Sequence, residues 1–279
     1  MALDLSQYEK RGYLFEEFRM FHLRDVRMER IDWHYHDFHK LILFVSGQAS
    51  YAIEGKSYNL RPGDLVVVPR GCIHCPRIED PSPYERIILY ISPEFLRGMS
   101  TEDCNLETCF DAAKENFSFV LRPEGKFDIF LNVLLQLEKT ILSEGFGKNV
   151  LKRALFLQFL VEVTRASAQA QFSYVSTAHY DEKTVAILQY LNNHLTEPVS
   201  IDALAEHFYL SKYHMMRRFK AETGYTIHAY LSEKRLMLAR EYIRAGMPVM
   251  QACEACGYGD YSSFSRAYRK LFSASPRGK

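Results

Sequence analysis

The last part of the chain carries the same helical pattern twice. The segments IDALAEHFYLSKYHMMRRFKAETG (201–224) and VMQACEACGYGDYSSFSRAYRKLF (249–272) align residue for residue around Arg217 and Arg266. Each reads as a short helix, a tight turn and a longer helix, and the helix expected at 227–244 joins them. This repeat restricts the region to an all-α domain with two helix-turn-helix units.

Apolar residues recur at helical spacing throughout this region, and each break between helices carries a cap or a breaker residue, such as Gly224 or Pro248. The spacing predicts helices over 184–195, 201–208, 212–222, 227–244, 249–256 and 261–272. We place the domain over 182–279. It holds 14 Lys and Arg against 9 Asp and Glu, a net charge of +5, whereas the remainder has 21 against 25. A modest basic excess suits contact with nucleic acid.

The first unit predicts a helix with two different faces. Ser211 can cap it, and Met215 and Phe219, four residues apart, share the buried face. A helix with an apolar stripe behind and basic and aromatic residues in front can fill a DNA major groove. The residues expected to face outward are Lys212, Tyr213, Met216, Arg217 and Lys220.

The second unit repeats this arrangement. Asp260 can cap its longer helix, and Phe264 and Tyr268 share the buried face. The residues expected to face outward are Tyr261, Ser262, Ser265, Arg266 and Arg269, with Lys270 beside them. Two such units on one rigid connector could enter successive major grooves, roughly 34 Å apart on the duplex.

Residues 182–279 resemble the DNA-binding domain of the AraC/XylS family of bacterial transcription regulators. The residues that carry the resemblance are Ala205, Ser211, Arg217, Phe219, Gly224, Tyr230, Arg235, Ala239, Gly257, Tyr258, Phe264, Arg266, Tyr268, Ser275 and Pro276. The chain departs from the family pattern at Pro248, Ala252 and Cys253. The resemblance implies that Tyr213, Met216, Arg217, Tyr261, Ser262, Ser265 and Arg266 approach base edges. Lys212, Lys220, Arg269 and Lys270 are better placed for phosphates.

The first part of the chain predicts a different architecture. Residues 15–95 contain short runs of β-branched and aromatic residues, separated by Gly, Pro and Asn, which indicate an antiparallel barrel or sandwich. Two apolar helices follow at about 126–166, broken by SEGFGKN. This helical hairpin has more apolar surface than one small barrel needs to cover, so we favour a dimer interface over packing within one chain. The domain ends near 168, and the small, polar residues 169–181 have linker composition.

The stretch HYHDFHK (34–40) decides how the first domain is interpreted. On a strand, His34, His36 and Lys40 point to one face, whereas Asp37 and His39 point to the other. Together with Gly47 and the later G-x5-P-x-G-x2-H run that ends at His74, the stretch resembles the motifs of the cupin superfamily. The resemblance implies a barrel-shaped, ligand-sensing domain.

In metal-binding cupins, three histidines and a glutamate hold the ion, and Lys40 occupies the glutamate position here. A protonated lysine has no lone pair to donate, so we expect no metal and no cofactor. We expect an organic effector instead, polar or anionic, bound by His34, His36, Lys40, Ile42, Phe44 and His74. The alternative for these side chains is hydrogen bonding within the barrel.

The leading hypothesis is therefore a dimeric DNA-binding transcription regulator without enzymatic activity, controlled by a small molecule. Activation is favoured over repression, and RNA polymerase is a further expected partner. The alternatives are a metal-dependent cupin enzyme or metal or redox sensor fused to a DNA-binding domain, and a constitutive DNA-binding protein with an empty barrel. Cys72, Cys75, Cys104 and Cys109 leave a loosely spaced zinc site open. The sequence has no signal-peptide-like run at its start and no membrane span, so we expect a cytoplasmic protein, bound to the nucleoid when it binds DNA.

Overall fold

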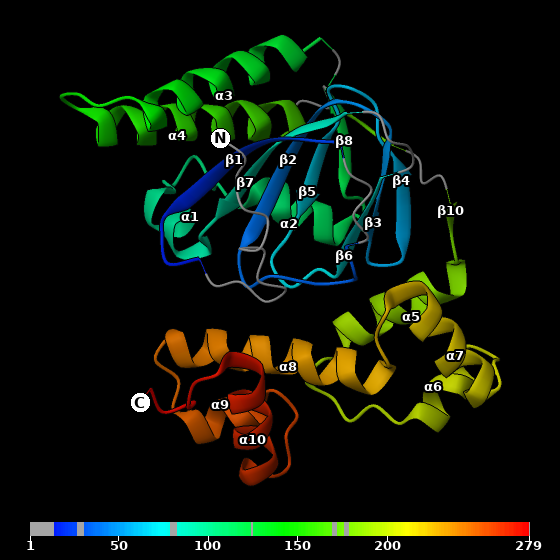
Figure 1. Cartoon of the computed structure of the whole chain (residues 1–279). Helices are drawn as coiled ribbons and strands as arrows, with labels where there is room; N and C mark the ends of the chain where they lie inside the picture. The colour runs from blue at the N-terminus through cyan, green and yellow to red at the C-terminus, as the bar shows by residue number, and fades with distance from the viewer. Residues whose placement is uncertain are drawn as a thin grey trace. The chain divides into compact units, whose positions relative to one another are not determined.

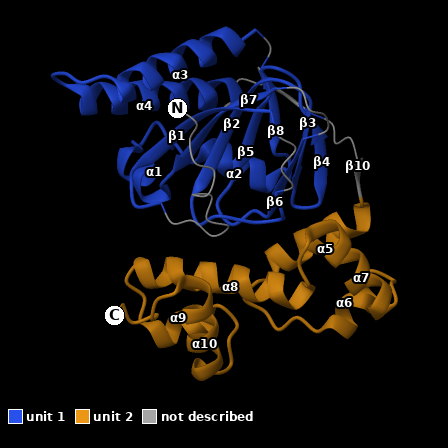
Figure 2. Ribbon diagram, viewed as in Figure 1, with its two compact units in different colours: residues 1–179 blue, residues 180–279 orange. Residues whose placement is uncertain are grey.

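The computed structural model describes residues 14–26, 31–78, 83–123, 125–168, 172–175 and 179–278. The start of the chain, where the sequence shows no signal-peptide-like run, lies outside these ranges. The chain divides into two compact units, residues 1–179 and residues 180–279 (Figure 2). We describe each unit by itself. No helix in the described ranges is both long enough and apolar enough to cross a membrane.

The first unit is built on two antiparallel sheets (Figure 1). One sheet has the order β1-β7-β2-β5-β8-β9, and the other contains the order β4-β3-β6. The strands are β1 (Phe18–Asp25), β2 (His39–Ser46), β3 (Ala49–Ile53), β4 (Lys56–Asn59), β5 (Leu65–Val68), β6 (His74–Ile78), β7 (Tyr84–Ile91), β8 (Val120–Pro123) and β9 (Phe172–Tyr174). The two-residue strand β10 (His179–Tyr180) contains the boundary between the units.

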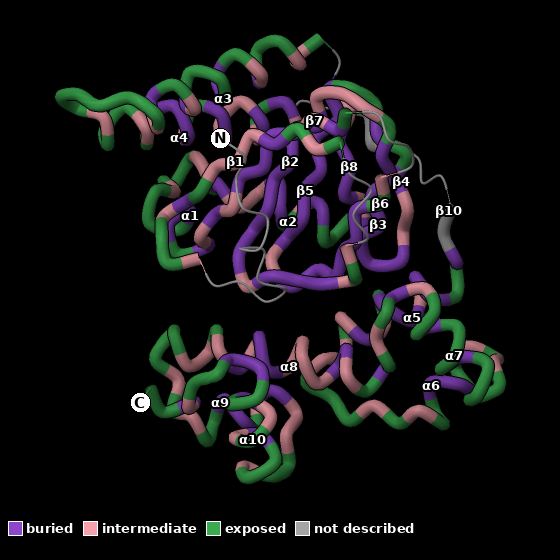
Figure 3. The backbone as a smooth tube through the Cα atoms, viewed as in Figure 1, coloured by how far each residue is buried: buried purple, intermediate pink, exposed green. Residues whose placement is uncertain are grey.

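The most apolar runs of the sequence form the centre of the larger sheet. Strand β5 is buried along its whole length and β2 is buried from His39 to Phe44, as Figure 3 shows by colour. Strands buried on both faces are expected to read as continuous apolar runs, and these do. Gly47 ends β2 at a φ of +108°, and a Cβ there would lie 2.6 Å from the carbonyl oxygen of Pro83. Only glycine suits such a position.

In the described part of the first unit, the sheets are accompanied by the helices α1 (Pro93–Met99), α2 (Thr108–Glu115), α3 (Phe127–Leu142) and α4 (Lys148–Ala168). The last two form the expected helical hairpin. The ring of Phe156 in α4 stacks on Phe18 of β1 with ring centroids 3.9 Å apart, and Phe130 in α3 meets Phe159 in α4 edge-on. The hairpin therefore packs through aromatic side chains against the edge of the larger sheet.

Part of the segment expected to be a linker is in a sheet. Strand β9 pairs with β8, with Tyr174 opposite Leu121 and Phe172 opposite Pro123. Residues 169–171 and 176–178 lie outside the described residues. The composition did not predict this strand, because backbone hydrogen bonds to a sheet edge do not require an apolar sequence.

The second unit is all helix, as the sequence predicts. Its helices are α5 (Glu182–Asn193), α6 (Ile201–His207), α7 (Lys212–Thr223), α8 (Ile227–Arg244), α9 (Val249–Ala255) and α10 (Tyr261–Phe272). Every boundary lies within two residues of the expected one. The expected fold class is confirmed: an antiparallel β domain with a helical hairpin, followed by an all-α domain with two helix-turn-helix units.

Candidate functional site

Helix α7 of the second unit has the two faces expected from its sequence. The side chain of Ser211 accepts a hydrogen bond from the His214 backbone N–H at 3.3 Å and so caps the helix start. Met215 and Phe219 are buried, so the side chains on the opposite face of the helix point toward solvent. The expected residues Lys212, Tyr213, Met216, Arg217 and Lys220 are all exposed.

Helix α10 has the same design with a stronger cap. The two carboxylate oxygens of Asp260 accept from the backbone N–H groups of Ser262 and Ser263 at 3.1 and 2.7 Å. Phe264 and Tyr268 are buried beneath it. Of the expected outward residues, Ser262, Arg266, Arg269 and Lys270 are exposed, whereas Tyr261 and Ser265 are half-buried.

The two candidate base-reading arginines have neighbours that restrict their side chains. The guanidinium carbon of Arg217 lies 5.7 Å from the centre of the Tyr213 ring, one helical turn earlier. Arg266 donates to the hydroxyl of Ser263 at 3.3 Å. Both contacts are local to their helix, so both guanidinium groups remain available at the surface.

Arg235 of the connecting helix α8 ties the two helix-turn-helix units together. It donates to the carbonyl oxygens of Leu195 and Glu197, which precede α6, and to that of Gly257, which precedes α10. Gly257 has a φ of +76°, and a Cβ there would lie 3.0 Å from the carbonyl oxygen of Thr196. Gly257 and Arg235 thus fix the distance between the α6–α7 unit and the α9–α10 unit.

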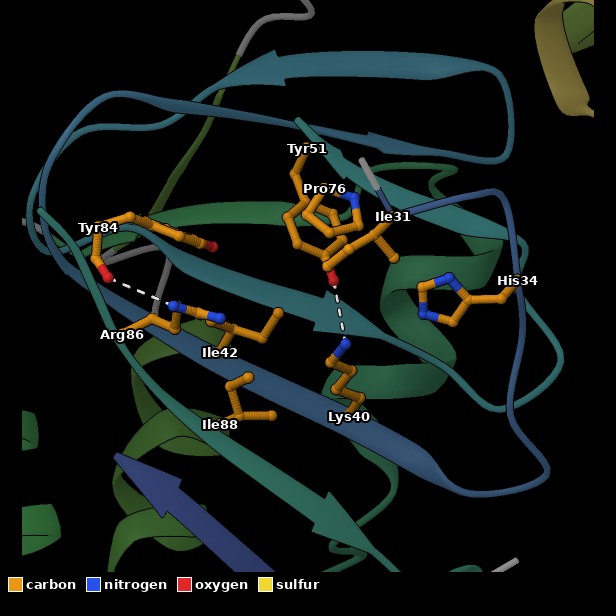
Figure 4. Close-up of a pocket in the computed structure, with 9 residues that line it drawn as sticks. All are labelled: Ile31, His34, Lys40, Ile42, Tyr51, Pro76, Tyr84, Arg86 and Ile88. Atoms are coloured by element: carbon orange, nitrogen blue, oxygen red, sulfur yellow. Dashed lines mark hydrogen bonds between the residues drawn. The ribbon is translucent and has the colours of Figure 1, made fainter. Parts of the chain in front are cut away.

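In the first unit, a cavity of about 30 Å³ lies between the two sheets (Figure 4). Its walls come from β2 and β7 of the larger sheet, from β3 and β6 of the smaller sheet, and from the loop before β2. The lining residues are Ile31, His34, Lys40, Ile42, Tyr51, Pro76, Tyr84, Arg86 and Ile88. The cavity is mostly apolar, with a few converging polar groups. Its volume is about that of one water molecule, so a small-molecule ligand enters it only when the lining side chains move apart.

The structure brings part of the expected ligand set to this cavity. His34, Lys40 and Ile42 line it, whereas Phe44 does not and instead packs against Tyr84 with ring centroids 5.7 Å apart. His36 and His74 stand next to His34, with ring centroids 5.0 and 4.3 Å away.

Sequence reasoning missed Tyr51, Tyr84 and Arg86. The signal for Arg86 was available, because a lone charge at the same parity as Tyr84 and Ile88 in an apolar strand points to the same interior.

Lys40 is the most unusual charged group in the cavity. It is 3% exposed, and its Nζ makes a hydrogen bond to the Tyr51 hydroxyl at 3.1 Å. No carboxylate of the described residues forms an ion pair with it. Burial, and then the nearby charge of Arg86, lowers the pKa of Lys40 to about 7.

Arg86 lines the cavity, and its guanidinium contacts other groups of the protein. It forms an ion pair with Asp25, donates to the backbone oxygen of Tyr84 at 3.3 Å, and lies over the Tyr84 ring. These contacts hold its guanidinium in one place between strands β1 and β7. The charge of Arg86 is therefore balanced by Asp25. The charge of a protonated Lys40 is balanced by no carboxylate among the described residues.

The three histidines could hold a metal ion. One ring nitrogen of each lies within 4.8 Å of the others, and both ring nitrogens of His36 and Nε2 of His74 are buried without a hydrogen-bond partner. Burial lowers the pKa of His36 and His74 well below the usual value, so both rings are neutral near pH 7. Three neutral imidazoles suit zinc or a similar ion. Lys40 occupies the glutamate position of the cupin motif, and a protonated lysine has no lone pair with which to coordinate the ion.

The third histidine of the HYHDFHK stretch and the four cysteines lie elsewhere. His39 turns away from the cluster, as its parity predicts: it contacts Glu107 at 3.3 Å and packs on Phe110 of α2. Within the described ranges, Cys72, Cys75, Cys104 and Cys109 do not join a group close enough to share an ion.

Comparison with protein families decides the identity. A model of an AraC-like ligand-binding domain matches residues 21–160, and a model of a helix-turn-helix domain matches residues 204–278. The chain belongs to the AraC family of transcription regulators. As an AraC-family member with both domains, it is a DNA-binding regulator controlled by a ligand.

Curated relatives of this AraC-family chain are also regulators. It is 26% identical to the HTH-type transcriptional activator RhaS of Escherichia coli O139:H28, over 91% of this chain and 89% of the relative. The RhaS of Salmonella agona is 26% identical over 88% and 85%. Among solved structures, ToxT from Vibrio cholerae is 13% identical over 94% of this chain and 97% of its own, with a TM-score of 0.36. The C-terminal domain of AraT from Geobacillus stearothermophilus is 24% identical over 35% and 82%, with a TM-score of 0.34.

Proposed function

We propose that this protein acts in the bacterial cytoplasm as a dimeric activator of transcription, and that a small polar or anionic molecule in the cavity around Lys40 controls it. The observation that carries the DNA-binding part is the matched pair of helices α7 and α10. Each has a capped start and a buried stripe, and each carries an exposed arginine, Arg217 or Arg266. Activation is supported by the RhaS relatives, which are described as activators. An activator would also contact RNA polymerase.

The two exposed faces divide between base and phosphate contacts. Arg217 and Arg266 each suit a bidentate contact to the O6 and N7 of a guanine. Tyr213, Met216, Tyr261, Ser262 and Ser265 lie beside them for further base contacts. Lys212, Lys220, Arg269 and Lys270 suit phosphates, and Lys212 must first leave its ion pair with Asp202, 2.9 Å away.

The test replaces each arginine and measures binding to an operator selected from random duplexes. Arg217→Ala and Arg266→Ala should each weaken operator binding by about 1–3 kcal/mol while leaving binding to random duplex almost unchanged. Fluorescence anisotropy at several salt concentrations separates the two kinds of binding.

The matched control is Arg77→Ala, which removes an exposed arginine from the first unit. It should leave operator affinity unchanged. An equal loss on operator and random duplex for both arginine variants would show that they contact phosphates only.

The effector proposal is supported by the chemistry of the cavity. Lys40 places a positive charge near the hydroxyl of Tyr51 and the His34 ring, and Arg86, paired with Asp25, adds N–H donors. These groups suit a carboxylate, a phosphate or several hydroxyls. A ligand can control the protein only if it binds one arrangement of the chain more tightly than another.

A thermal-shift screen of polar metabolites on the full chain is the test. An active compound should also change operator affinity. Absence of any compound that shifts both properties would favour a constitutive DNA-binding protein.

The dimer proposal is supported by the tip of the α3–α4 hairpin. Leu142, Phe146, Val150 and Leu151 are exposed large apolar side chains around this tip. Such a cluster on a solvent-facing hairpin suits a second copy of the chain. Sedimentation analysis should show a dimer that dissociates in the double variant Phe146→Asp, Leu151→Asp, and a monomeric wild type would contradict it.

A metal-responsive regulator or metal-dependent enzyme is the second candidate, favoured by the geometry of His34, His36 and His74. Protein purified without chelator should then contain stoichiometric transition metal that is lost on His34→Ala. Lys40→Glu should raise metal affinity, because it restores a carboxylate to the fourth position. Metal-free wild type that gains no affinity from this substitution would rule the candidate out.

A further inference from the structure

The residues that follow helix α10 turn back toward its start. Ser273 ends the helix in the left-handed conformation, with a φ of +51°, and its N–H donates to the Arg269 carbonyl oxygen at 2.9 Å. A second turn follows, in which the N–H of Gly278 donates to the carbonyl oxygen of Ser275 at 3.1 Å. Arg277 lies within this second turn and is exposed.

The two turns bring Arg277 beside the first residue of α10. Its guanidinium carbon lies 5.5 Å from the centre of the Tyr261 ring. Contact with an aromatic face restricts an arginine side chain and leaves its N–H groups available to an anion. In the described part of the chain, no carboxylate forms an ion pair with Arg277. We propose that Arg277 is a further DNA-binding residue, which contacts a phosphate at the start of α10.

Helices α7 and α10 differ at their first residue. Ser211 caps α7 and Asp260 caps α10, so Lys212 and Tyr261 occupy equivalent positions in the two helices. Helix α7 therefore starts with a cation that suits a phosphate, whereas α10 starts with a neutral phenol. Arg277 supplies, from the segment after the helix, the positive charge that α10 itself lacks at this place.

The cap of α10 gives this positive charge a second role. The Asp260 carboxylate is exposed, and its hydrogen bonds to Ser263 and Ser262 lower its pKa, so it is charged at pH 7. The Ser211 hydroxyl that caps α7 is neutral. A carboxylate at the end of a helix that approaches DNA repels the phosphates, and a cation beside that end offsets the repulsion. The second unit therefore needs a cation such as Arg277 more than the first unit does.

This proposal rests on the proposed contact of α10 with DNA. A phosphate contact carries no sequence information, so its loss has a different signature from the loss of a base contact at Arg266. Each phosphate neutralised on a duplex adds about 0.9 to the steepness with which log affinity falls against log salt concentration. Loss of Arg277 should therefore reduce this slope, and should do so equally on operator and on random duplex.

The test measures fluorescence anisotropy of the full chain with both duplexes over a series of salt concentrations. Arg277→Gln should reduce the slope by about 0.9 and weaken binding to both duplexes roughly five- to tenfold at about 0.1 M salt. Arg277→Lys keeps the charge and should restore most of the slope. The matched control is Lys183→Gln, which removes an exposed cation from α5, outside both helix-turn-helix units, and should leave the slope unchanged.

Two results would overturn the phosphate contact. Weaker binding to the operator with an unchanged slope would show that Arg277 reads a base or only packs on Tyr261. An equal reduction of the slope by Lys183→Gln would assign the effect to the net charge of the chain. Because Arg277 is exposed, Arg277→Gln should also keep the melting temperature of the helical unit, followed by circular dichroism.

Arg266→Ala, measured in the same series, separates failure of this proposal from failure of the proposed contact of α10 with DNA. Weaker operator binding by Arg266→Ala, with no change for Arg277→Gln, would overturn the Arg277 contact alone. No change for either variant on any duplex would show that α10 does not contact DNA, and would overturn both.

Discussion

The two units of the molecule differ in where their charged side chains lie: in the interior of the β unit and on the surface of the helical unit. In the β unit, charged and polar side chains lie in the interior: His36, His74, Lys40, Asp64 and Arg86 are all buried. In the helical unit, Asp181 is the only buried Asp, Glu, His, Lys or Arg among the described residues. Burying such groups costs free energy unless they are paired, as Asp64 and Arg86 are. His36, His74 and Lys40 have no ion-pair partner among the described residues, so they lower the stability of the β unit.

This difference in burial suits two kinds of binding, to DNA by the helical unit and to a small molecule by the β unit. The helical unit contacts its partner from the surface, through side chains that need no burial to work. The β unit holds its polar groups where a small molecule can be enclosed and water excluded. Substitution of interior charges should therefore change the stability of the first unit, whereas substitution of exposed charges in the second should change affinity for DNA.

The largest expected effect comes from breaking the buried ion pair of the first unit. Asp64 is fully buried and accepts two hydrogen bonds from Arg122, both 2.7 Å long, and one from the Arg61 N–H. Asp64→Asn keeps the volume and removes the charge, and should lower the free energy of unfolding by about 3 kcal/mol, because Arg122 is left partly buried without its partner. Trp33 is the only tryptophan, so its fluorescence during urea unfolding reports this unit.

The matched variant in the second unit is Asp202→Asn, which breaks the exposed ion pair with Lys212. Its cost should stay below about 1 kcal/mol, since exposed pairs contribute little. It should also strengthen binding to any duplex slightly, because Lys212 becomes available to phosphates. Equal losses of stability for the two variants would break the contrast between the units.

The sequence predicted the helical unit more completely than the β unit. Helix boundaries depend on local features, such as the cap at Ser211 and the breakers at Gly224 and Pro248, and these can be read directly. The strand β8 could not be found this way, because it follows two helices and pairs with β5 more than fifty residues earlier. Its sequence, VLRP, has no distinctive pattern.

The lining of the cavity was half predicted for the same reason. The motif residues His34 and Lys40 come from one stretch with clear parity, whereas Tyr51 reaches the cavity from a strand of the opposite sheet. Phe44 has the same parity as Ile42, but it lies beyond the end of the cavity, against Tyr84. Parity gives the face of a strand and not the extent of the cavity along it.

The second prediction concerns the buried amine. Lys40→Met should stabilise the first unit by about 1–2 kcal/mol at pH 6, because an apolar side chain of similar length replaces a buried, unneutralised charge. Below pH 7 Lys40 is protonated in both the folded and the unfolded chain, so the wild type bears the full cost. Trp33 fluorescence during urea unfolding measures the difference.

The pH dependence of this difference has a definite sign. As pH rises from about 7 toward the unfolded value near 10.5, the folded wild type releases the proton before the unfolded chain does, so its stability rises toward that of Lys40→Met. A difference that stays constant from pH 6 to pH 10 would mean that Lys40 does not titrate in this window. Lys139→Met serves as the control, since Lys139 is an exposed lysine on α3 of the same unit and should show no such pH-dependent difference.

The third prediction compares helices α7 and α10, which we propose to contact DNA. Ser211 caps α7 with one hydrogen bond of 3.3 Å, whereas Asp260 caps α10 with two of 3.1 and 2.7 Å. Ser211→Ala should lower the stability of the helical unit by about 1 kcal/mol, and Asp260→Ala should lower it further. The thermal loss of the helical circular dichroism signal measures both. Asp260→Asn keeps the side-chain oxygen and should lose least, whereas an order with Ser211→Ala as the most damaging would contradict the cap geometry.

The smallest effect is expected at His22, which joins the sheets to the hairpin. Its Nε2 lies 3.0 Å from Glu85 of β7, and its Nδ1 lies 3.0 Å from Glu138 of α3. Burial alone lowers the pKa of His22, but the hydrogen bonds to the two carboxylates outweigh it and raise the pKa above 6.5. The folded state therefore holds the proton more tightly than the unfolded state. This stabilisation is complete below pH 6.5 and is lost as pH rises through the folded value.

Because the bridge is partly exposed to solvent, we expect it to contribute less than about 1 kcal/mol. His22→Gln should match the wild type at high pH and fall below it only in acid, as measured by Trp33 fluorescence in urea at a series of pH values. This dependence is opposite to the one expected for Lys40, whose cost is relieved at high pH. A wild type that gains stability over His22→Gln as the solution becomes alkaline would show that this histidine is held neutral, like His36 and His74.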